Sequence, residues 1–453
     1  MPPLPPLFAE EMRRVFGPEK GDALLDALQT TPDTAVRANR AKGFDTARLP
    51  GAAAGVAWCD AGRYLDARPQ FARMPEWHAG AFYVQDASSM IVSAVIERLL
   101  PQLDTSSPAL LDLCAAPGGK TTAALDALPQ GSVVTANEVM PARAAVLREN
   151  ILKWGRAEVI VTSAQAERFG RLGALYDIVL ADVPCSGEGM MRKEAEARRQ
   201  WSEGLVDSCA ALQRRIVADA LPALRPGGFL IYSTCTFNTA EDEENVESLI
   251  AEHGLEPVDL LLPSEWGILP SVRPERPWLR FLPGLTRGEG LFMAVLRKPE
   301  ESAAARPRRV RLPRPVRNAP LQWLDAERGF SAWEEKDGLH AMTEECMTMA
   351  TRLRDAGIPL LASGIHLAEA KGRDFVAAPA LAWQTALRPD AFPRVDLPLD
   401  DALRFLRREA LVLPPDTPLG HVIATYGALP LGFLKNLGTR ANNLYPAEWR
   451  LRT

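Results

Sequence analysis

The middle of the chain alternates short apolar segments with helix-forming ones, and this alternation constrains the fold more than any other feature. The apolar segments are ALLDLCA, SVVTANEV, AEVIVTS, YDIVLADV and GGFLIYSTC. Helix-forming stretches such as Pro141 to Trp154 and Leu205 to Leu224 lie between them. Strands joined by helices pair in parallel through right-handed crossovers, so we predict an α/β fold with a doubly wound, mostly parallel sheet. The segments WLRFLPG and GLFMAVLRK follow with only turn residues between them, which predicts an antiparallel edge.

The length of 453 residues exceeds one ordinary domain, and changes in composition indicate where the chain divides. We expect an amino-terminal accessory α+β domain over residues 1–104, a Rossmann-like domain over 105–299, and two carboxyl-terminal domains over 321–385 and 386–453. Residues 300–320 include RPRRVRLPRPVR, with six arginines and no acid. Proline disfavours a helix here, so an extended linker is predicted. Further expected elements are helices over Phe8–Phe16, Gly21–Leu28, Leu339–Ala356 and Leu399–Glu409, and strands and a turn in GHVIATYGALPLGFLKN.

Composition and cysteine usage exclude several classes of protein. Apolar residues make up 47% of the chain and charged residues 24%, as in ordinary globular proteins. The amino terminus lacks a signal sequence and no apolar run is long enough to span a membrane, so a cytoplasmic protein is expected. Six irregularly spaced cysteines and five scattered histidines predict free thiols and no metal site. We also expect a monomer. The net charge of −5 does not by itself indicate a nucleic-acid partner.

The segment DLCAAPGGKTT, Asp112 to Thr122, follows the first predicted strand and resembles a phosphate-binding loop at its end. Gly119, Lys120 and Thr121 match the last residues of Gly-x-x-x-x-Gly-Lys-Ser/Thr. Cys114, however, stands where that motif requires its first glycine, and that glycine permits the turn that wraps the phosphates. The loop is therefore not expected to bind a nucleoside triphosphate.

A dinucleotide-binding fingerprint is absent as well, since Gly118 and Gly119 are adjacent rather than spaced as Gly-x-Gly-x-x-Gly. Glu138 closes the next predicted strand, where an acid suits two ribose hydroxyls at the switch point of the sheet. A cofactor with ribose but no phosphate fits this pattern, which predicts S-adenosylmethionine. The alternative is that Pro-Gly-Gly merely forms a tight turn between strand and helix.

Two later motifs place reactive side chains at the same edge of the predicted sheet. Asp182 and Cys185 directly follow the fourth strand in VLADVPCSGEG, and Cys235 follows the fifth in LIYSTCTF. Because the carboxyl ends of such strands face one crevice, a carboxylate and two thiols should converge on the methyl donor. The alternative for any cysteine is a small buried hydrophobe, and we assign that role to Cys59, Cys209 and Cys346.

The motifs DLCAAPGGKT, ADVPCSGEGM and YSTCTF, in this order, resemble those of the Sun-type RNA cytosine-5 methyltransferases. YVQDASS and PLGFLKNLGTRANNLYPAEWR resemble the bacterial RsmF-type members, which modify 16S ribosomal RNA. The resemblance implies a class I S-adenosylmethionine-dependent methyltransferase with a PUA-like carboxyl-terminal region. It also implies 16S ribosomal RNA, or the small ribosomal subunit, as the partner. A tRNA or DNA cytosine methyltransferase, or a non-catalytic RNA-binding assembly factor, are the alternatives.

The resemblance assigns roles to the three reactive residues. Carbon 5 of cytosine is a poor nucleophile, and a thiolate that adds to carbon 6 activates it. In the Sun-type family this thiolate is the Thr-Cys residue, Cys235, while the Pro-Cys residue, Cys185, assists product release. DNA cytosine-5 methyltransferases use the Pro-Cys residue for attack, which is the reverse assignment. Asp182 would position the base through hydrogen bonds, or would only fix the Pro-Cys loop.

The same resemblance carries over a set of cofactor contacts. They are Cys114, Ala115, Ala116, Pro117, Gly118, Gly119, Lys120, Glu138, Arg143 and Asp182. Family members usually carry an aspartate for the adenine amine after the third strand, where this chain has Gln165. A glutamine carbonyl accepts the same hydrogen bond, so Gln165 is included.

The target base must leave its stack to reach the thiol, so single-stranded or flipped RNA is the expected substrate. Predicted RNA contacts come from three segments of the chain: Arg37, Asn39 and Arg40; Arg192, Lys193, Arg198 and Arg199; and Lys435, Asn436, Arg440, Asn442 and Tyr445. For the middle segment, a solvated charged helix is the alternative.

Overall fold

The computed structural model describes residues 1–303, 305, 309–372 and 374–452. Arg306, Pro307 and Arg308 of the predicted arginine-proline linker lie outside the described residues. Within the described ranges, no helix combines the length and the apolar character that a membrane span requires.

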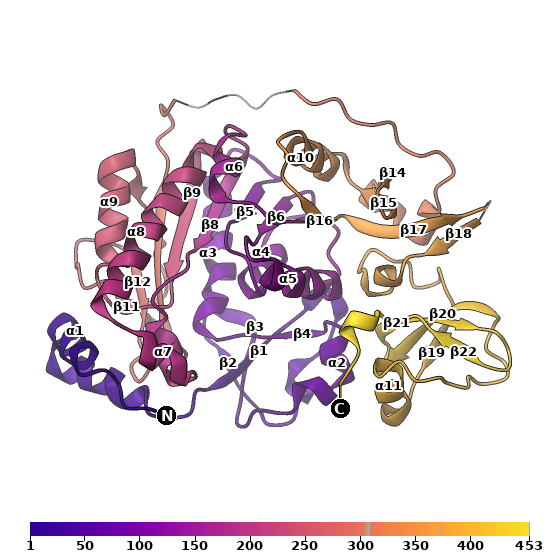
Figure 1. Ribbon diagram of the computed structural model, residues 1–453, viewed down its shortest axis with the longest axis horizontal. Helices are drawn as coiled ribbons and strands as arrows, with labels where there is room; N and C mark the ends of the chain where they lie inside the picture. The colour runs from indigo at the N-terminus through magenta and orange to yellow at the C-terminus, as the bar shows by residue number, and fades with distance from the viewer. Residues whose placement is uncertain (304, 306–308, 373, 453) are drawn as a thin grey trace.

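A large central sheet organises the described residues (Figure 1). Its parallel strands are β5 (Ala109–Asp112), β6 (Val133–Asn137), β7 (Val159–Thr162), β8 (Tyr176–Asp182) and β9 (Leu224–Thr234). In space they are ordered β9-β8-β5-β6-β7, so the winding reverses between β5 and β8. The carboxyl ends of these two strands therefore open the crevice that such sheets use for ligands.

Antiparallel strands extend the sheet at both edges. Beyond β9 lie β13 (Leu291–Arg297), β12 (Leu279–Phe281) and β11 (Leu269–Pro270), and the short β10 (Glu256–Pro257) also pairs with β13. These strands confirm the predicted antiparallel edge. At the other edge β16 (Leu360–Ser363) pairs antiparallel with β7. This strand comes from the segment after the linker and has no counterpart in the sequence prediction.

Helices cover both faces of the central sheet. They are α3 (Ile91–Leu99), α4 (Gly119–Ala127), α5 (Pro141–Trp154), α6 (Ala166–Gly170), α8 (Glu203–Ala220), α9 (Glu243–His253) and α10 (Glu344–Asp355). The short helix α7 (Ala195–Gln200) packs instead with residues of the amino-terminal helix. Leu110 packs with residues of α3, α4 and α5, whereas its neighbour Leu111 packs with residues of α6, α8, α9 and α10. Successive residues of a strand point to opposite faces, so apolar residues at consecutive positions bury both faces.

The predicted helix Leu339–Ala356 is wrong in its first part. Gly338–Met342 forms strand β15, and α10 begins only at Glu344. Thr343 caps this helix, because its hydroxyl accepts a hydrogen bond from the backbone N–H of Cys346. The apolar residues before Thr343 belong to β15 and those after it belong to α10. Their spacing in the sequence resembles that of one continuous helix, which is why a single helix was predicted.

The amino-terminal part consists of one kinked helix and a small antiparallel sheet. Helix α1 (Pro6–Ala27) contains Gly17 in a non-helical, positive-φ conformation (φ 79°), so the two predicted helices meet at a kink. The sheet has the order β2-β3-β1-β4, with β1 (Thr34–Ala38), β2 (Ala52–Val56), β3 (Cys59–Leu65) and β4 (Phe82–Val84). Helix α2 (Pro75–His78) precedes β4.

Two further small sheets follow the linker. One contains β14 (Ser331–Glu335), β15, β17 (Ile365–Lys371) and β18 (Asp374–Ala377). The other contains β19 (Arg394–Asp396), β20 (Gly420–Tyr426), β21 (Leu429–Asn436) and β22 (Ala441–Asn443), with helix α11 (Leu399–Leu406). Residues of the last sheet share a core with the amino-terminal sheet, and the Trp383 indole N–H donates to the His78 carbonyl (3.2 Å). The amino-terminal sheet and the last sheet are thus packed together, whereas the amino terminus itself lies apart from the carboxyl terminus (Figure 1).

Candidate active site

The predicted reactive side chains meet at the carboxyl ends of β8 and β9. Lys120 Nζ lies 2.7 Å from Asp182 Oδ2, and the Ser233 hydroxyl donates to Asp182 Oδ1 (2.7 Å). Burial alone would lower the pKa of Lys120, but the charges of Asp182 and of an ionised Cys235 raise it above its usual value. The lysine is therefore cationic and oriented between a carboxylate and a thiol.

Cys185 and Cys235 are in direct contact, with their sulfur atoms 3.1 Å apart. This distance is well beyond a disulfide bond of about 2.05 Å, and both cysteines are free thiols. A hydrogen bond to Cys235 is the main cause that raises the pKa of Cys185 well above its usual range, and burial adds to it. Cys185 therefore holds its proton tightly.

Glu188 binds the Cys185 loop to the Cys235 loop. Its carboxylate is buried and accepts four hydrogen bonds: from the backbone N–H of Phe237 (2.7 Å) and Asn238 (3.0 Å), from the Asn238 side-chain amide (3.0 Å), and from the Trp201 indole (2.9 Å). Burial raises the pKa of Glu188 to about 7, while these donors act in the opposite direction. All four partners are donors, so the arrangement requires an accepting carboxylate.

Gly189 brings the two loops still closer. Its backbone N–H donates to the Cys235 carbonyl (2.8 Å), and a Cβ atom at this position would lie only 2.7 Å from that oxygen. Glu241 adds a second buried carboxylate, which accepts from the Ser186 backbone (3.0 Å) and from Gln213 (2.6 Å). Sequence reasoning missed these positioning residues, because a motif does not show which distant loop its acid contacts.

The predicted cofactor loop connects β5 to α4. Gly118 caps α4 with φ 111°, a conformation that favours glycine. Arg143 donates to the Ala116 carbonyl (2.8 Å) and lies 3.3 Å from Glu138 Oε2. Burial is the main cause that raises the pKa of the Cys114 thiol, so this side chain is uncharged. The loop therefore offers backbone groups and a neutral surface rather than a phosphate cradle.

One buried carboxylate oxygen beside this loop, Asp112 Oδ1, has no hydrogen-bond donor among the described residues, whereas Glu138 Oε2 lies 3.3 Å from the Arg143 guanidinium. The other oxygen of Asp112 accepts from the Thr121 hydroxyl (2.6 Å), and that of Glu138 accepts from the Met140 N–H (2.9 Å). Burial raises the pKa of Asp112 to about 7. S-adenosylmethionine carries ribose hydroxyls and an ammonium group, which are donors that these two carboxylates can accept. The residues present thus fit this cofactor.

Gln165 follows β7 and is exposed at the start of α6, with no side-chain cap hydrogen bond. Its proposed contact with adenine stays a prediction. Arg143 and Glu138, by contrast, already contact each other at the crevice.

Several predicted RNA contacts are instead parts of the protein interior. Arg37 is 1% exposed and pairs with Asp126, and Asn39 is fully buried and donates to the carbonyls of Gly80 and Trp154. Tyr445 and Asn436 are buried as well. These side chains satisfy buried partners, so they are not available to RNA, and the sequence prediction is wrong for them.

The predicted RNA contacts that follow the Cys185 loop are also partly buried and partly exposed. Arg198 donates to the carbonyls of Met191 (2.6 Å) and Leu28 (2.7 Å), and Arg192 pairs with Glu289 (3.0 Å). Both join this segment to other parts of the chain instead of facing solvent. The remaining predicted RNA contacts are exposed: Arg40, Lys193, Arg199, Lys435, Arg440 and Asn442.

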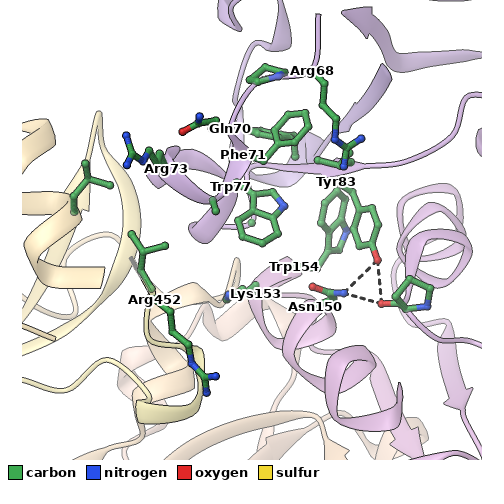
Figure 2. Close-up of a pocket in the computed structure, with 18 of the residues that line it drawn as sticks. Arg68, Gln70, Phe71, Arg73, Trp77, Tyr83, Asn150, Lys153, Trp154 and Arg452 are labelled. Atoms are coloured by element: carbon green, nitrogen blue, oxygen red, sulfur yellow. Dashed lines mark hydrogen bonds between the residues drawn. The ribbon is translucent and has the colours of Figure 1, made fainter. Parts of the chain in front are cut away.

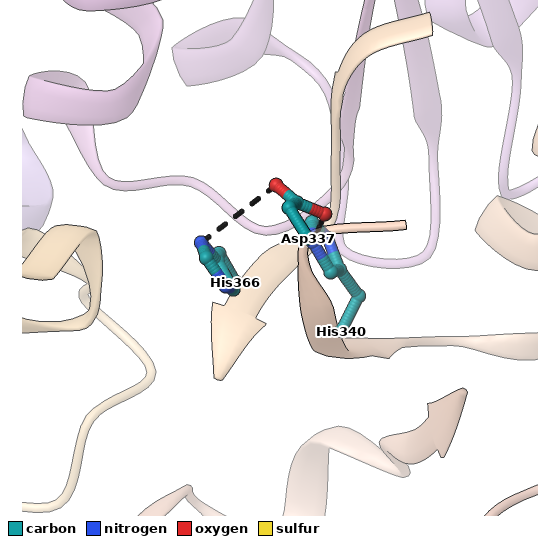
Figure 3. Close-up of side chains that lie close together, drawn as sticks. All are labelled: Asp337, His340 and His366. Carbon is teal, nitrogen blue, oxygen red and sulfur yellow. Dashed lines mark hydrogen bonds and ion pairs between the residues drawn. The ribbon is translucent and has the colours of Figure 1, made fainter. Parts of the chain in front are cut away.

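A cluster of possible metal ligands lies away from the crevice, on β15 and β17 and the turn before β15 (Figure 3). The ligand atoms of Asp337, His340 and His366 lie within 4.8 Å of one another. The His340 Nδ1–H donates to the Ser363 carbonyl (2.8 Å), and its Nε2 lies 2.9 Å from Asp337. The hydrogen bond from His340 is the main cause that holds the pKa of Asp337 well below its usual value. The expected lack of a metal site stays a prediction, since histidines scattered in sequence are adjacent here.

Comparison with known proteins identifies the family. Residues 99–297 match the family described as 16S rRNA methyltransferase RsmB/F, residues 4–87 match the N-terminal domain of 16S rRNA methyltransferase RsmF, and residues 392–451 match the methyltransferase RsmF PUA domain. The ribosomal RNA small subunit methyltransferase F of Erwinia tasmaniensis is 30% identical over 98% of this chain and 96% of its own length. The protein of the same name from an Enterobacter species is 32% identical over 87% of this chain and 83% of its own.

Solved structures agree on the fold. NSun6 from Pyrococcus horikoshii with SFG matches with a TM-score of 0.56 at 20% identity, over 65% of this chain and 98% of its own. A methyltransferase homolog from the same organism matches with a TM-score of 0.52 at 24% identity, over 64% and 94% of the two chains. The predicted fold class, the PUA-like region and the use of S-adenosylmethionine are thereby confirmed. The chain belongs to the RsmF family of 16S ribosomal RNA methyltransferases.

Proposed function

We propose that this enzyme methylates carbon 5 of a cytidine in 16S ribosomal RNA through a covalent bond between Cys235 and carbon 6 of the base. The observation that carries the proposal is the contact of two free thiols, 3.1 Å apart, beside the Lys120–Asp182 pair. A methyltransferase that acts on nitrogen or on a ribose oxygen has no need of two thiols at the methyl donor. Carbon 5 of cytosine does need a nucleophile, because the ring must become an enamine before it can accept a methyl cation.

The proposed reaction has three steps. The Cys235 thiolate adds to carbon 6, and the electron pair moves to carbon 5. Carbon 5 then takes the methyl group that S-adenosylmethionine supplies, and S-adenosylhomocysteine is the leaving product. A base removes the proton that remains on carbon 5, and the resulting electron pair expels Cys235 as a thiolate.

The raised pKa of Cys185 supports these roles. The hydrogen bond to Cys235 and burial raise the pKa of Cys185, so Cys185 is poorly suited to be the attacking thiolate. The charge of an ionised Cys235 is one cause that raises the pKa of Lys120. The Lys120 ammonium in turn stabilises a thiolate at Cys235. Once Cys235 is bonded to carbon 6, the hydrogen bond that is the main cause of the raised pKa of Cys185 is lost, while burial remains. Cys185 then ionises more readily and is placed to remove the proton from carbon 5.

Asp182 is proposed to hold the base. Lys120 and Ser233 fix its carboxylate, and its side chain is 32% exposed toward the crevice. A fixed carboxylate accepts from the exocyclic amine of cytosine, which uracil lacks. The cationic Lys120 that pairs with Asp182 offsets the negative charge that develops in the ring.

Two variants test the assignment. Cys235→Ala should lose methyl transfer and form no covalent complex with RNA. Cys185→Ala should accumulate a protein–RNA complex that survives denaturing electrophoresis, because addition proceeds and release does not. A complex that accumulates in Cys235→Ala instead would reverse the two roles.

Bisulfite sequencing tests the substrate. Ribosomal RNA from cells with and without the gene should differ at one or more 5-methylcytidines in 16S RNA. If every 5-methylcytidine of 16S RNA persists without the protein, the cytosine-5 proposal fails.

A further inference from the structure

A deep cavity of about 850 Å³ lies where the amino-terminal sheet, helix α5 and the carboxyl-terminal end of the chain meet (Figure 2). Neither Cys185 nor Cys235 lines it. Two kinds of side chain dominate its walls. The aromatic ones are Phe71, Trp77, Phe82, Tyr83 and Trp154, and the basic ones are Arg68, Arg73, Lys153, Arg407 and Arg452.

The cavity is strongly basic although the chain as a whole has a net charge of −5. No aspartate or glutamate is among the residues that line it in the described part of the chain. Lys153 pairs with Glu149, and Arg407 pairs with Glu409. Arg68, Arg73 and Arg452 are exposed, and the described residues offer none of them an ion pair. Three uncompensated guanidinium groups at one cavity indicate an anionic occupant.

The aromatic rings indicate which class of anion the cavity binds. Trp77 and Tyr83 are half-buried, so each leaves part of a ring open to the cavity, as Figure 2 shows. Phe71, Phe82 and Trp154 also line the cavity and are buried. Free phosphate or an acidic peptide would not require exposed aromatic rings in its binding site. An unpaired nucleotide uses both kinds of side chain, since its base stacks on aromatic rings while its phosphate pairs with arginine.

A second cavity of about 930 Å³ adjoins this site. Arg68 and Val84 line both cavities. The second one is also lined by Arg192 and Lys193, which follow the Cys185 loop in the chain. The lining of the second cavity is mixed in charge, because Asp33, Asp66 and Asp86 line it too, and Arg192 and Lys193 both pair with Glu289.

The wall of the aromatic cavity also contacts the cofactor loop. The Tyr83 hydroxyl donates to the Pro117 carbonyl (3.0 Å), and so does the Asn150 side-chain amide (2.8 Å). Asn150 also donates to the Tyr83 oxygen (3.2 Å). A base that stacks on Tyr83 would therefore contact a residue that is hydrogen-bonded to the cofactor loop.

We propose that this cavity binds an unpaired nucleotide of the RNA substrate, away from the target cytidine, with its base on Trp77 and Tyr83 and its phosphates on Arg68, Arg73 and Arg452. The proposal rests on the proposed function, because it takes the occupant from the same RNA. It adds a second specificity site, built jointly by the two ends of the chain.

Fluorescence anisotropy with a labelled single-stranded RNA of mixed sequence tests the charges, using the full-length protein. The double variant Arg68→Glu, Arg73→Glu should weaken binding at least tenfold. It should also reduce the slope of log K against log salt by about 0.7 for each phosphate that the variant no longer neutralises. Arg48→Glu is the matched control, since Arg48 is an exposed arginine of the same part of the chain that does not line the cavity, and it should bind like the parent. Equally weakened binding in the control, or unchanged binding in the double variant, overturns the proposal.

Ultraviolet crosslinking of the same RNA tests the aromatic contacts directly. Peptides that contain Trp77 or Tyr83 should carry the crosslinked nucleotide, and crosslinks confined to the Cys235 side overturn the proposal. Trp77→Phe should retain binding that Trp77→Ala loses. If the parent protein forms no 5-methylcytidine, the proposed function has failed. If the parent methylates RNA and the arginine variants bind and methylate equally well, only the cavity proposal has failed.

Discussion

The catalytic crevice and the aromatic cavity use charge in opposite ways. In the crevice Lys120 pairs with Asp182, and the buried carboxylates Glu188 and Glu241 are surrounded by donors. In the cavity Arg68 and Arg73 have no carboxylate partner among the described residues. Paired and buried groups hold atoms in place for chemistry, whereas unpaired surface cations are free to bind a partner outside the protein. Substitutions should therefore damage stability and turnover in the crevice, but affinity alone in the cavity.

Glu188→Ala should have the largest effect. It leaves the buried N–H groups of Phe237, Asn238 and Trp201 without an acceptor. Each unsatisfied buried group costs about 1–3 kcal/mol, so the free energy of unfolding should fall by about 3 kcal/mol or more in urea titrations. Methyl transfer should fall at least a hundredfold. Glu196→Ala, which removes an exposed partner of Arg199, should be nearly neutral. Equal stability of the two variants would refute the role of Glu188 in joining the two loops.

Gly189→Ala should come next. The added Cβ would approach the Cys235 carbonyl to 2.7 Å, so the two cysteine loops must separate. We expect kcat for methyl transfer to fall about tenfold or more, while the affinity for S-adenosylmethionine changes little. Gly204→Ala on α8 is the control, because nothing lies within 4 Å of its Cβ position. It should stabilise the protein slightly, by up to about 1 kcal/mol. Equal kcat in both variants would show that the loops tolerate separation.

Asp112→Asn should change how stability depends on pH. Burial raises the pKa of Asp112 to about 7, whereas an unfolded aspartate titrates near ~3.9. Between these values the folded protein binds the extra proton, so this group makes stability fall as pH rises. Without cofactor, the variant should gain on the order of 2 kcal/mol relative to the parent between pH 5 and pH 8. Parallel stability curves in urea titrations at the two pH values would contradict the assignment.

Arg73→Ala should have the smallest effect on stability. Its guanidinium is exposed and makes no ion pair within the described chain, so the free energy of unfolding should change by less than about 0.5 kcal/mol. Binding of single-stranded RNA should nevertheless weaken in the anisotropy titration. A large decrease in stability would place Arg73 in the structural framework, and the contrast between the two regions would disappear.

Local pattern predicted the parts of the molecule that depend on neighbouring residues. Helix α5 begins at Pro141 and ends at Trp154, as predicted, because proline starts the helix and Gly155 ends it. The prediction failed where a distant partner decides. Arg37 and Arg198 were predicted to contact RNA, yet Asp126 and backbone carbonyls bind them inside the protein. Strand β16 was missed because its pairing partner, β7, lies some two hundred residues earlier in the chain.

The sequence by itself determined the parallel sheet, the order of its strands along the chain, and the placement of Asp182, Cys185 and Cys235 at strand ends. These features follow from alternating apolar segments and from the rule that parallel strands end at one edge. Only the tertiary structure decided that the two sulfur atoms touch, that Glu188 joins their loops, and that both ends of the chain enclose a basic aromatic cavity. Such contacts join residues far apart in sequence, and their energies depend on burial, which no short motif encodes.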